Sequence, residues 1–254
     1  MNMTLQGKVA FITGAASGVG RACALSFSAE GANVALLDMN REGLAETIAL
    51  LPNPEAALAL DCDVTQVSSV RDAVQNTLSR WNRLDAAVNA AGVEGATRPL
   101  LEEDDDLYNR VMDINVRGVW NCMRAQIEQM LRQDTGGSIV NVSSGAGLVG
   151  SARSAVYGTS KHAVVGLTRS AALQYARKGV RINAVCPSGI QTPMAERIVA
   201  SFQGGAPSAG GANYPLGRYS TPGEIASGIL WLSSPGAASA IGTVLAIDAG
   251  FTAA

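Results

Sequence analysis

The chain has 254 residues, of which 47% are hydrophobic and 16% charged, and its formal net charge is −2. A chain of this length and composition can bury a large core as one α/β domain. Its weak acidity and the absence of a basic stripe argue against nucleic acid as a partner. Four scattered cysteines and a single histidine, His162, predict neither a metal site nor a disulfide framework. No signal peptide or membrane-length apolar run is visible, so we expect a cytoplasmic protein without a membrane partner.

The first predicted strand is the apolar run at residues 8–13, and a glycine turn and a helical pattern follow it. Strand, glycine turn and helix in this order are the context of a dinucleotide-binding fingerprint. Gly14 allows the tight turn, Gly18 lets the backbone approach a pyrophosphate, and Gly20 lets the helix pack closely on the strand. Backbone N–H groups at the helix start would then face the phosphates. The cofactor-binding residues expected in this turn are Gly14, Ser17, Gly18, Val19 and Gly20.

A second buried strand, residues 33–38, ends in Asp38. About twenty residues past the glycines, a carboxylate can accept hydrogen bonds from the adenosine ribose hydroxyls. The same carboxylate would repel the 2′-phosphate of NADP. Neither Met39 nor Asn40 supplies a compensating positive charge, although Arg41 is close enough to keep NADP as an alternative. The sequence therefore predicts NAD as the cofactor.

Strand-like and helical segments alternate along the rest of the chain. They comprise a strand at 57–60, a helix at 68–81, a strand at 84–89, a helix pair at about 102–132, a strand at 138–142, a helix that carries Tyr157, a strand at 180–185, a helix that opens at Thr221-Pro222, and a strand at 244–248. This alternation predicts a Rossmann-type α/β fold, a doubly wound parallel sheet of about seven strands with helices on both faces. Ligands of such sheets bind at the carboxyl ends of the strands.

Tyr157 and Lys161 lie four residues apart on a predicted helix, so both project from one face. An ammonium group there can stabilise a phenolate and lower the pKa of the phenol from about 10. Ser144, thirteen residues before the tyrosine, could hold a substrate oxygen while Tyr157 takes or gives its proton. Ser143 is an alternative, but the spacing favours Ser144. His162 points away from the face shared by the tyrosine and the lysine, and we interpret it as structural.

These motifs together resemble those of the short-chain dehydrogenase/reductase family over residues 7–251. The residues that carry the resemblance are Thr13-Gly14-x-x-x-Gly18-x-Gly20, Asn89-Ala90-Ala91-Gly92, Asn115, Ser144, Tyr157 and Lys161. The resemblance implies a catalytic set of Asn115, Ser144, Tyr157 and Lys161, in which Asn115 distorts its helix and anchors a water that leads to Lys161. It also implies further cofactor contacts from Asp63, Val64, Asn89, Ala90, Gly92, Tyr157, Lys161, Pro187, Gly189, Ile190 and Thr192, with Asp63 and Val64 at the adenine and Lys161 at the nicotinamide ribose.

The sequence departs from the family pattern at Ser188, which stands where glycine is usual, with Gly189 one position later. In the family this segment cradles the nicotinamide amide. The departure therefore leaves the shape of the local backbone open.

Substrate contacts are expected from residues 194–216, a small lid on an otherwise single domain that spans residues 1–254. The candidate substrate residues are Glu94, Ser144, Val149, Arg153, Met194, Ile198 and Phe202. An apolar lid favours an uncharged cyclic or aryl-alkyl alcohol. Glu94, Arg153 and Asn213 would instead favour a hydroxylated or anionic substrate.

The sequence predicts an NAD(H)-dependent oxidoreductase that interconverts a secondary alcohol and a ketone, with a small molecule as its substrate. The alternatives are a sugar or polyol dehydrogenase, an NADP-preferring ketoreductase, and a non-catalytic NAD-binding module. The complete set of catalytic residue types argues against the last. By resemblance we also expect a homotetramer with dihedral symmetry, formed through the helix at 224–232 with the strand at 244–247 and through the helices around Asn115 and Tyr157.

Overall fold

The computed structural model describes residues 5–201, 211–212 and 214–253. Its centre is one parallel sheet in the order β3-β2-β1-β4-β5-β6-β7. The strands are β1 (Val9–Thr13), β2 (Asn33–Asp38), β3 (Ala57–Asp61), β4 (Ala86–Asn89), β5 (Gly137–Val142), β6 (Val180–Pro187) and β7 (Val244–Ile247). The predicted doubly wound sheet of seven strands is therefore confirmed.

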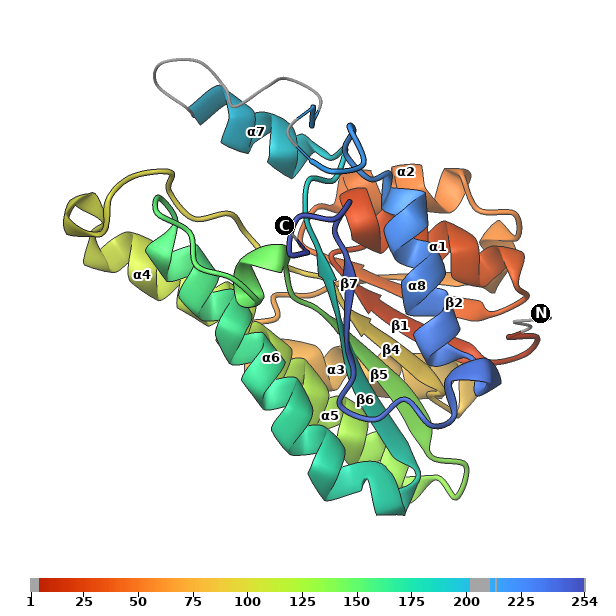
Figure 1. The fold of residues 1–254 in the computed structure, drawn as a ribbon. Helices are drawn as coiled ribbons and strands as arrows, with labels where there is room; N and C mark the ends of the chain where they lie inside the picture. Colours follow the sequence, from red (N-terminus) through yellow and green to blue (C-terminus); the bar gives the residue numbers. More distant parts are fainter. Residues whose placement is uncertain (1–4, 202–210, 213, 254) are drawn as a thin grey trace.

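Helices cover both faces of the sheet (Figure 1). One layer contains α1 (Gly18–Ala29), α2 (Arg41–Ala49) and α8 (Pro222–Ser233), and the other contains α3 (Val67–Trp81), α4 (Asp105–Met112), α5 (Gly118–Arg132) and α6 (Ala155–Tyr175). A further helix, α7 (Pro193–Ser201), lies apart from both layers, beyond the end of the sheet. None of the helices in the described ranges has the length and apolarity needed to cross a membrane.

Two apolar cores follow from the alternation of side chains along the strands. Ile12 and Leu36 pack with Phe27 of α1 and Ile229 of α8 on one side of the sheet. Their neighbours Phe11 and Leu37 face the opposite side, where Met123 of α5 and Val164 of α6 complete the second core. Both faces of the central strands are thus buried, and their carboxyl ends are left as the edge where polar groups gather.

The helix pair expected at about 102–132 begins slightly later, at Asp105, and changes to π-helical geometry where its two helices meet. Asp104 caps α4, because its carboxylate accepts a hydrogen bond from the Leu107 N–H at 2.8 Å. A π-helical segment, Asp113–Arg117, then joins α4 to α5 without a break. The expected cap at Thr221 is present as a capping box with Glu224.

Candidate functional site

The carboxyl ends of neighbouring strands bring most of the predicted site residues together. The Thr13 hydroxyl, at the end of β1, accepts hydrogen bonds from the N–H groups of Ala90 and Ala91, each at 3.1 Å. A Cβ atom at Gly92 would lie 3.2 Å from Asn115 Oδ1 and 3.5 Å from Lys161 Nζ. The segment after β4 therefore connects the glycine turn to the predicted catalytic residues.

Tyr157, Ser144 and Lys161 meet at the start of α6. The Ser144 hydroxyl is hydrogen-bonded to the Tyr157 phenol, and this bond lowers the pKa of the phenol. Lys161 is buried, its ammonium donates to the carbonyl of Val142 at 3.2 Å, and its Nζ lies 5.6 Å from the centre of the Tyr157 ring. A hydroxyl, a phenol and an ammonium group thus face one small region, as the spacing of these residues predicts.

The expected lowering of the Tyr157 pKa is wrong for this structure. Burial raises the pKa of the phenol, and the hydrogen bond from Ser144 offsets only part of this effect. Burial also lowers the pKa of Lys161 to about 8, because the loss of solvent disfavours the charged form of the amine. The spacing of the two residues correctly predicts that they lie close together, whereas their removal from water is a property of the assembled site.

The structure separates the two candidate serines. The Ser143 hydroxyl is buried and donates to the backbone carbonyl of Lys161 at 2.9 Å, so it holds α6 against β5. The Ser144 hydroxyl accepts from the Ala146 N–H at 3.1 Å and stays next to the tyrosine. His162 is exposed, and its Nδ1 lies 2.9 Å from the Gly158 carbonyl, which supports the structural interpretation.

Asn115 lies inside the π-helical segment, so the predicted helix distortion is present. Its buried side chain accepts from the Val93 N–H at 2.8 Å and donates to the Val93 carbonyl at 3.0 Å. The same amide donates to the Ser160 hydroxyl at 3.1 Å. The extra residue of the π turn thus aims Asn115 at the loop after β4 and ties that loop to α6.

The glycine turn before α1 is closely packed and depends on its glycines. A Cβ at Gly14 would lie 2.8 Å from the Ala91 nitrogen, and a Cβ at Gly20 would collide with the Gly14 carbonyl. Gly18 adopts a positive φ of 52°. The Ser17 side chain does not cap the first N–H groups of α1.

Asp38 is held in a defined orientation at the end of β2. One carboxylate oxygen accepts from the Ala16 N–H at 3.1 Å, and the other accepts from the Asn40 N–H at 3.0 Å. The carboxylate therefore sits between the glycine turn and the start of α2, where a ribose could be bound.

Comparison with known proteins identifies the family. A family model described as enoyl-(acyl carrier protein) reductase matches residues 14–252. The chain is 41% identical over 249 residues to a 2,5-dichloro-2,5-cyclohexadiene-1,4-diol dehydrogenase of Sphingobium indicum, and the match covers 98% of each chain. The chain belongs to the short-chain dehydrogenase/reductase family.

Two solved structures of this family are similar over nearly the whole chain. Levodione reductase has a TM-score of 0.92 and 35% identity, and the match covers 98% of this chain and 99% of that one. Carveol dehydrogenase from Mycobacterium avium, in complex with NAD, has a TM-score of 0.90 and 29% identity, with 96% and 97% covered. The protein is accordingly an oxidoreductase whose relatives interconvert secondary alcohols and ketones.

Two of the cofactor contacts expected from the short-chain dehydrogenase/reductase pattern involve side chains that are already engaged. The Asn89 side chain is buried and bonded to Asn141 and Gln126, at 2.8–3.0 Å, so it cannot contact a cofactor as a side chain. The Asp63 carboxylate accepts from the N–H and the hydroxyl of Thr65, at 2.9 and 2.8 Å, through one oxygen. Asn89 is thus a core residue, which its position at a strand end did not reveal.

The Ser188 departure from the family pattern is resolved by Gly189. Gly189 has a φ of 54°, and a Cβ there would lie 2.7 Å from both Tyr214 and Tyr219, so glycine is required one position later than usual. The Ser188 hydroxyl lies 3.2 Å from the Tyr214 hydroxyl, and the Tyr214 ring packs on Phe251 at 5.6 Å. The sequence contained no local signal that Tyr214 would join Ser188 to Phe251 near the end of the chain.

The segment that follows Pro187, at the end of β6, leads into α7. Pro187 is buried, Ile190 forms an isolated bridge with Ser220, and the Thr192 hydroxyl accepts from the Ala195 N–H at 3.3 Å. A Cβ at Gly18 would contact the Thr192 side chain at 3.4 Å. The start of α7 therefore lies next to the glycine turn.

The candidate substrate residues differ in their surroundings. Glu94 forms a two-point ion pair with Arg197 of α7, at 2.5 and 3.0 Å, and this pair lowers the pKa of Glu94. Val149, Met194 and Ile198 are half-buried, and Arg153 is exposed. Phe202 and Asn213 lie outside the described residues. The ion pair of Glu94 with Arg197 therefore connects the loop after β4 to α7. The sequence does not identify Arg197 as the partner.

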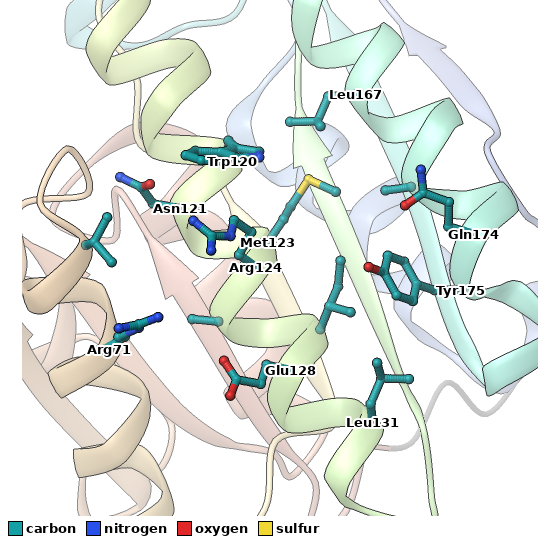
Figure 2. Close-up of a pocket in the computed structure, with 14 residues that line it drawn as sticks. Arg71, Trp120, Asn121, Met123, Arg124, Glu128, Leu131, Leu167, Gln174 and Tyr175 are labelled. Carbon is teal, nitrogen blue, oxygen red and sulfur yellow. The ribbon is translucent and has the colours of Figure 1, made fainter.

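A separate hollow of about 350 Å³ opens on the outer face of α3, α5 and α6 (Figure 2). Trp120, Arg124 and Leu131 of α5 line it together with Leu167 and Tyr175 of α6. Trp120 and Leu131 are 44% and 40% exposed, respectively. None of the predicted catalytic or cofactor residues lines this hollow, so it is distinct from the candidate active site.

Proposed function

We propose that this oxidoreductase is an NAD(H)-dependent dehydrogenase that interconverts a secondary alcohol and a ketone. The observation that carries the proposal is the contact of Ser144 with the Tyr157 phenol beside the buried ammonium of Lys161. An acid–base group next to a second hydroxyl and a buried ammonium is suited to proton transfer to or from a carbinol oxygen.

In this proposal Ser144 holds the substrate oxygen by a hydrogen bond, and Tyr157 takes or gives the proton on that oxygen. NAD bound at the glycine turn would supply the hydride acceptor. Because burial raises the pKa of Tyr157 and lowers that of Lys161 to about 8, the phenol is protonated and the amine mostly charged at neutral pH. This state is suited to donating a proton during reduction, whereas oxidation needs the phenolate and should become faster as pH rises.

Lys161 and Asn115 have supporting roles. The ammonium of Lys161 stabilises negative charge on the phenol, and by family resemblance it also binds the nicotinamide ribose. Asn115 holds Val93, and a Cβ at Gly95, two residues later, would meet the Tyr157 Cβ at 2.9 Å. Asn115 thus positions the loop that packs against the catalytic tyrosine.

The residues of the glycine turn fit NAD. Gly14, Gly18 and Gly20 leave room where any Cβ would intrude or be strained, and the start of α1 offers N–H donors for a pyrophosphate. Asp38 would accept hydrogen bonds from the ribose hydroxyls. Contacts from Ser17, Val19, Asp63, Val64, Ala90, Gly92, Pro187, Gly189, Ile190 and Thr192 complete the proposed cofactor site.

A preference for NAD over NADP is expected, because a phosphate next to the Asp38 carboxylate would be repelled. Screening secondary alcohols and ketones with both cofactors, in both directions, tests the proposal. Catalytic efficiency should be higher with NAD than with NADP. Asp38→Ala should reduce this difference in efficiency between the two cofactors. Equal or better efficiency with NADP in the unmodified protein would contradict the predicted preference, and no turnover with either cofactor would contradict the proposed function.

The proposed substrate is an uncharged cyclic alcohol. The half-buried apolar side chains of Met194 and Ile198 and the neutralisation of Glu94 by Arg197 support this class over a strongly polar one. A relative named as a cyclohexadiene-diol dehydrogenase supports it further. A hydroxylated or anionic substrate would need Arg153, which is exposed.

We expect the protein to assemble as a homotetramer, and the surface that we propose for one twofold contact is the hollow lined by α3, α5 and α6, where Trp120 and Leu131 are exposed (Figure 2). Light scattering should give four times the mass of one chain. Trp120→Glu places a charge in the hollow and should reduce the measured mass. Leu50→Glu, at a 58% exposed site that follows α2, should leave the mass unchanged. A monomer of the unmodified protein at working concentration would contradict the expectation.

A further inference from the structure

Asp61 and Arg41 form an ion pair beside the proposed ribose site. Asp61 ends β3 and is the register partner of Asp38 on β2. Arg41 is the first residue of α2, and its Nε and Nη2 atoms donate to one oxygen of Asp61 at 3.0 and 2.5 Å. The side chains of Arg41 and Asp61 are 79% and 47% exposed, so the pair stands at the surface of this strand edge.

The backbone around Arg41 is held in place relative to Asp38. The Asp38 carboxylate accepts from the Asn40 N–H at 3.0 Å, and the Asn40 side chain caps α2 by accepting from the Gly43 N–H at 3.0 Å. The position of the Arg41 guanidinium therefore depends on its side-chain torsions and on its partner. A long, exposed arginine can turn toward any nearby anion unless another anion already holds it.

The neighbouring arginine is committed elsewhere. The Arg21 guanidinium donates to the carbonyls of Ala16 and Gly43, at 2.5 and 3.3 Å, and to Glu46 at 2.7 Å. The Arg21 side chain is 26% exposed, and its bond to the Ala16 carbonyl supports the glycine turn. Arg41 is thus the arginine near Asp38 whose direction can change with little disturbance of the fold.

We infer that Asp61 is a positioning residue for cofactor choice, which holds the Arg41 guanidinium away from the place where the 2′-phosphate of NADP would bind. The inference rests on the proposed dinucleotide function. Asp38 disfavours the phosphate by repulsion, and Asp61 removes the cation that could offset this repulsion. Since arginine binds phosphate through paired charge-assisted hydrogen bonds, releasing Arg41 should strengthen NADP binding.

The test is a double-mutant cycle on the full chain, read by calorimetric dissociation constants for NAD⁺ and NADP⁺ rather than by turnover. Asp61→Asn should tighten NADP⁺ binding about fivefold, as expected for release from an exposed pair, and change NAD⁺ binding by less than about twofold. Arg41→Ala alone should leave NADP⁺ binding nearly unchanged. In the double variant, adding Asp61→Asn to Arg41→Ala should tighten NADP⁺ binding by less than about twofold, because the guanidinium that the substitution would release is absent.

Asp61→Glu serves as the matched control, because it keeps the charge and should keep the unmodified ratio of the two constants. Repeating the cycle with Asp38→Asn keeps NADP⁺ binding measurable if it is weak in the unmodified protein. The inference would be overturned if Asp61→Asn still tightened NADP⁺ binding in the Arg41→Ala background, or if Asp61→Asn alone did not tighten it. A clear weakening of NADP⁺ binding by Arg41→Ala alone would also overturn it. Failure of the unmodified protein to bind either dinucleotide would overturn the proposed function as well, whereas normal NAD⁺ binding with an additive cycle would overturn the inference alone.

Discussion

Replacing Tyr157 with phenylalanine is expected to lower turnover by at least about 10²–10⁴-fold in both directions while NAD binding is retained. The substitution removes only the phenolic hydroxyl, which is the group that exchanges a proton with the substrate in the proposed function. The ring would still pack against Gly95 and lie near the Lys161 ammonium, so the shape of the site should be kept. Steady-state rates and a dissociation constant for NAD, measured on the same preparation, check both parts.

A matched control is available on the same helix. Tyr175, the last residue of α6, has the ammonium of Lys178 at 5.5 Å from its ring centre, close to the 5.6 Å of the Tyr157–Lys161 pair. Tyr175→Phe should leave turnover within about twofold, because this pair lies outside the candidate active site and the substitution keeps the ring that lines the hollow of Figure 2. Near-normal turnover of Tyr157→Phe would mean that the proton moves by another route.

The fold was predictable because its signals are local and repeated. The buried strand β2 ends at Asp38, which breaks its apolar pattern, and α8 begins at the capping box of Thr221. Alternation of such segments leaves few topologies other than a doubly wound parallel sheet. The order of motifs from Gly14 to Lys161 then places the candidate residues at one edge of that sheet.

Contacts between distant segments were not predictable in the same way. Glu94 and Arg197 are 103 positions apart, and nothing near either residue indicates their pairing. The contact of Ser188 with Tyr214 likewise depends on how two segments 26 positions apart come together in the fold. A sequence pattern shows which residue types lie near a strand end. It does not show which of them form hydrogen bonds or ion pairs with distant residues in the folded protein.

Burial explains the two remaining differences. Asn89 has the residue type and position of a ligand contact, yet its amide is enclosed by Gln126 and Asn141. The raised pKa of Tyr157 has the same origin, because the loss of solvent is a property of the assembled site and outweighs the neighbouring groups. Spacing along a helix identifies partners, whereas the protonation state depends on everything packed around them.

Replacing Lys161 with methionine is expected to lower the rate of alcohol oxidation by about 10²-fold or more and to weaken NAD binding. Methionine keeps an unbranched side chain in the buried site but removes the ammonium that faces the tyrosine ring. In the unmodified protein, oxidation should become faster as pH rises, because the base form of Tyr157 is the phenolate. Without the ammonium, the phenolate is less stable, so this rise should shift to higher pH.

The pH dependence separates a catalytic effect from a structural one. The pKa of Lys161 is lowered to about 8, so its stabilising charge is complete well below that pH and decreases above it. The difference between the unmodified protein and Lys161→Met should therefore be largest below about pH 8 and become smaller in alkaline solution. Lys161→Arg keeps a charge and should recover part of the rate, and Lys178→Met, at the matched pair, should change neither rate nor profile. An unchanged pH profile in Lys161→Met, with only a uniform loss of activity, would assign Lys161 to packing and cofactor binding and leave the phenolate without its proposed support.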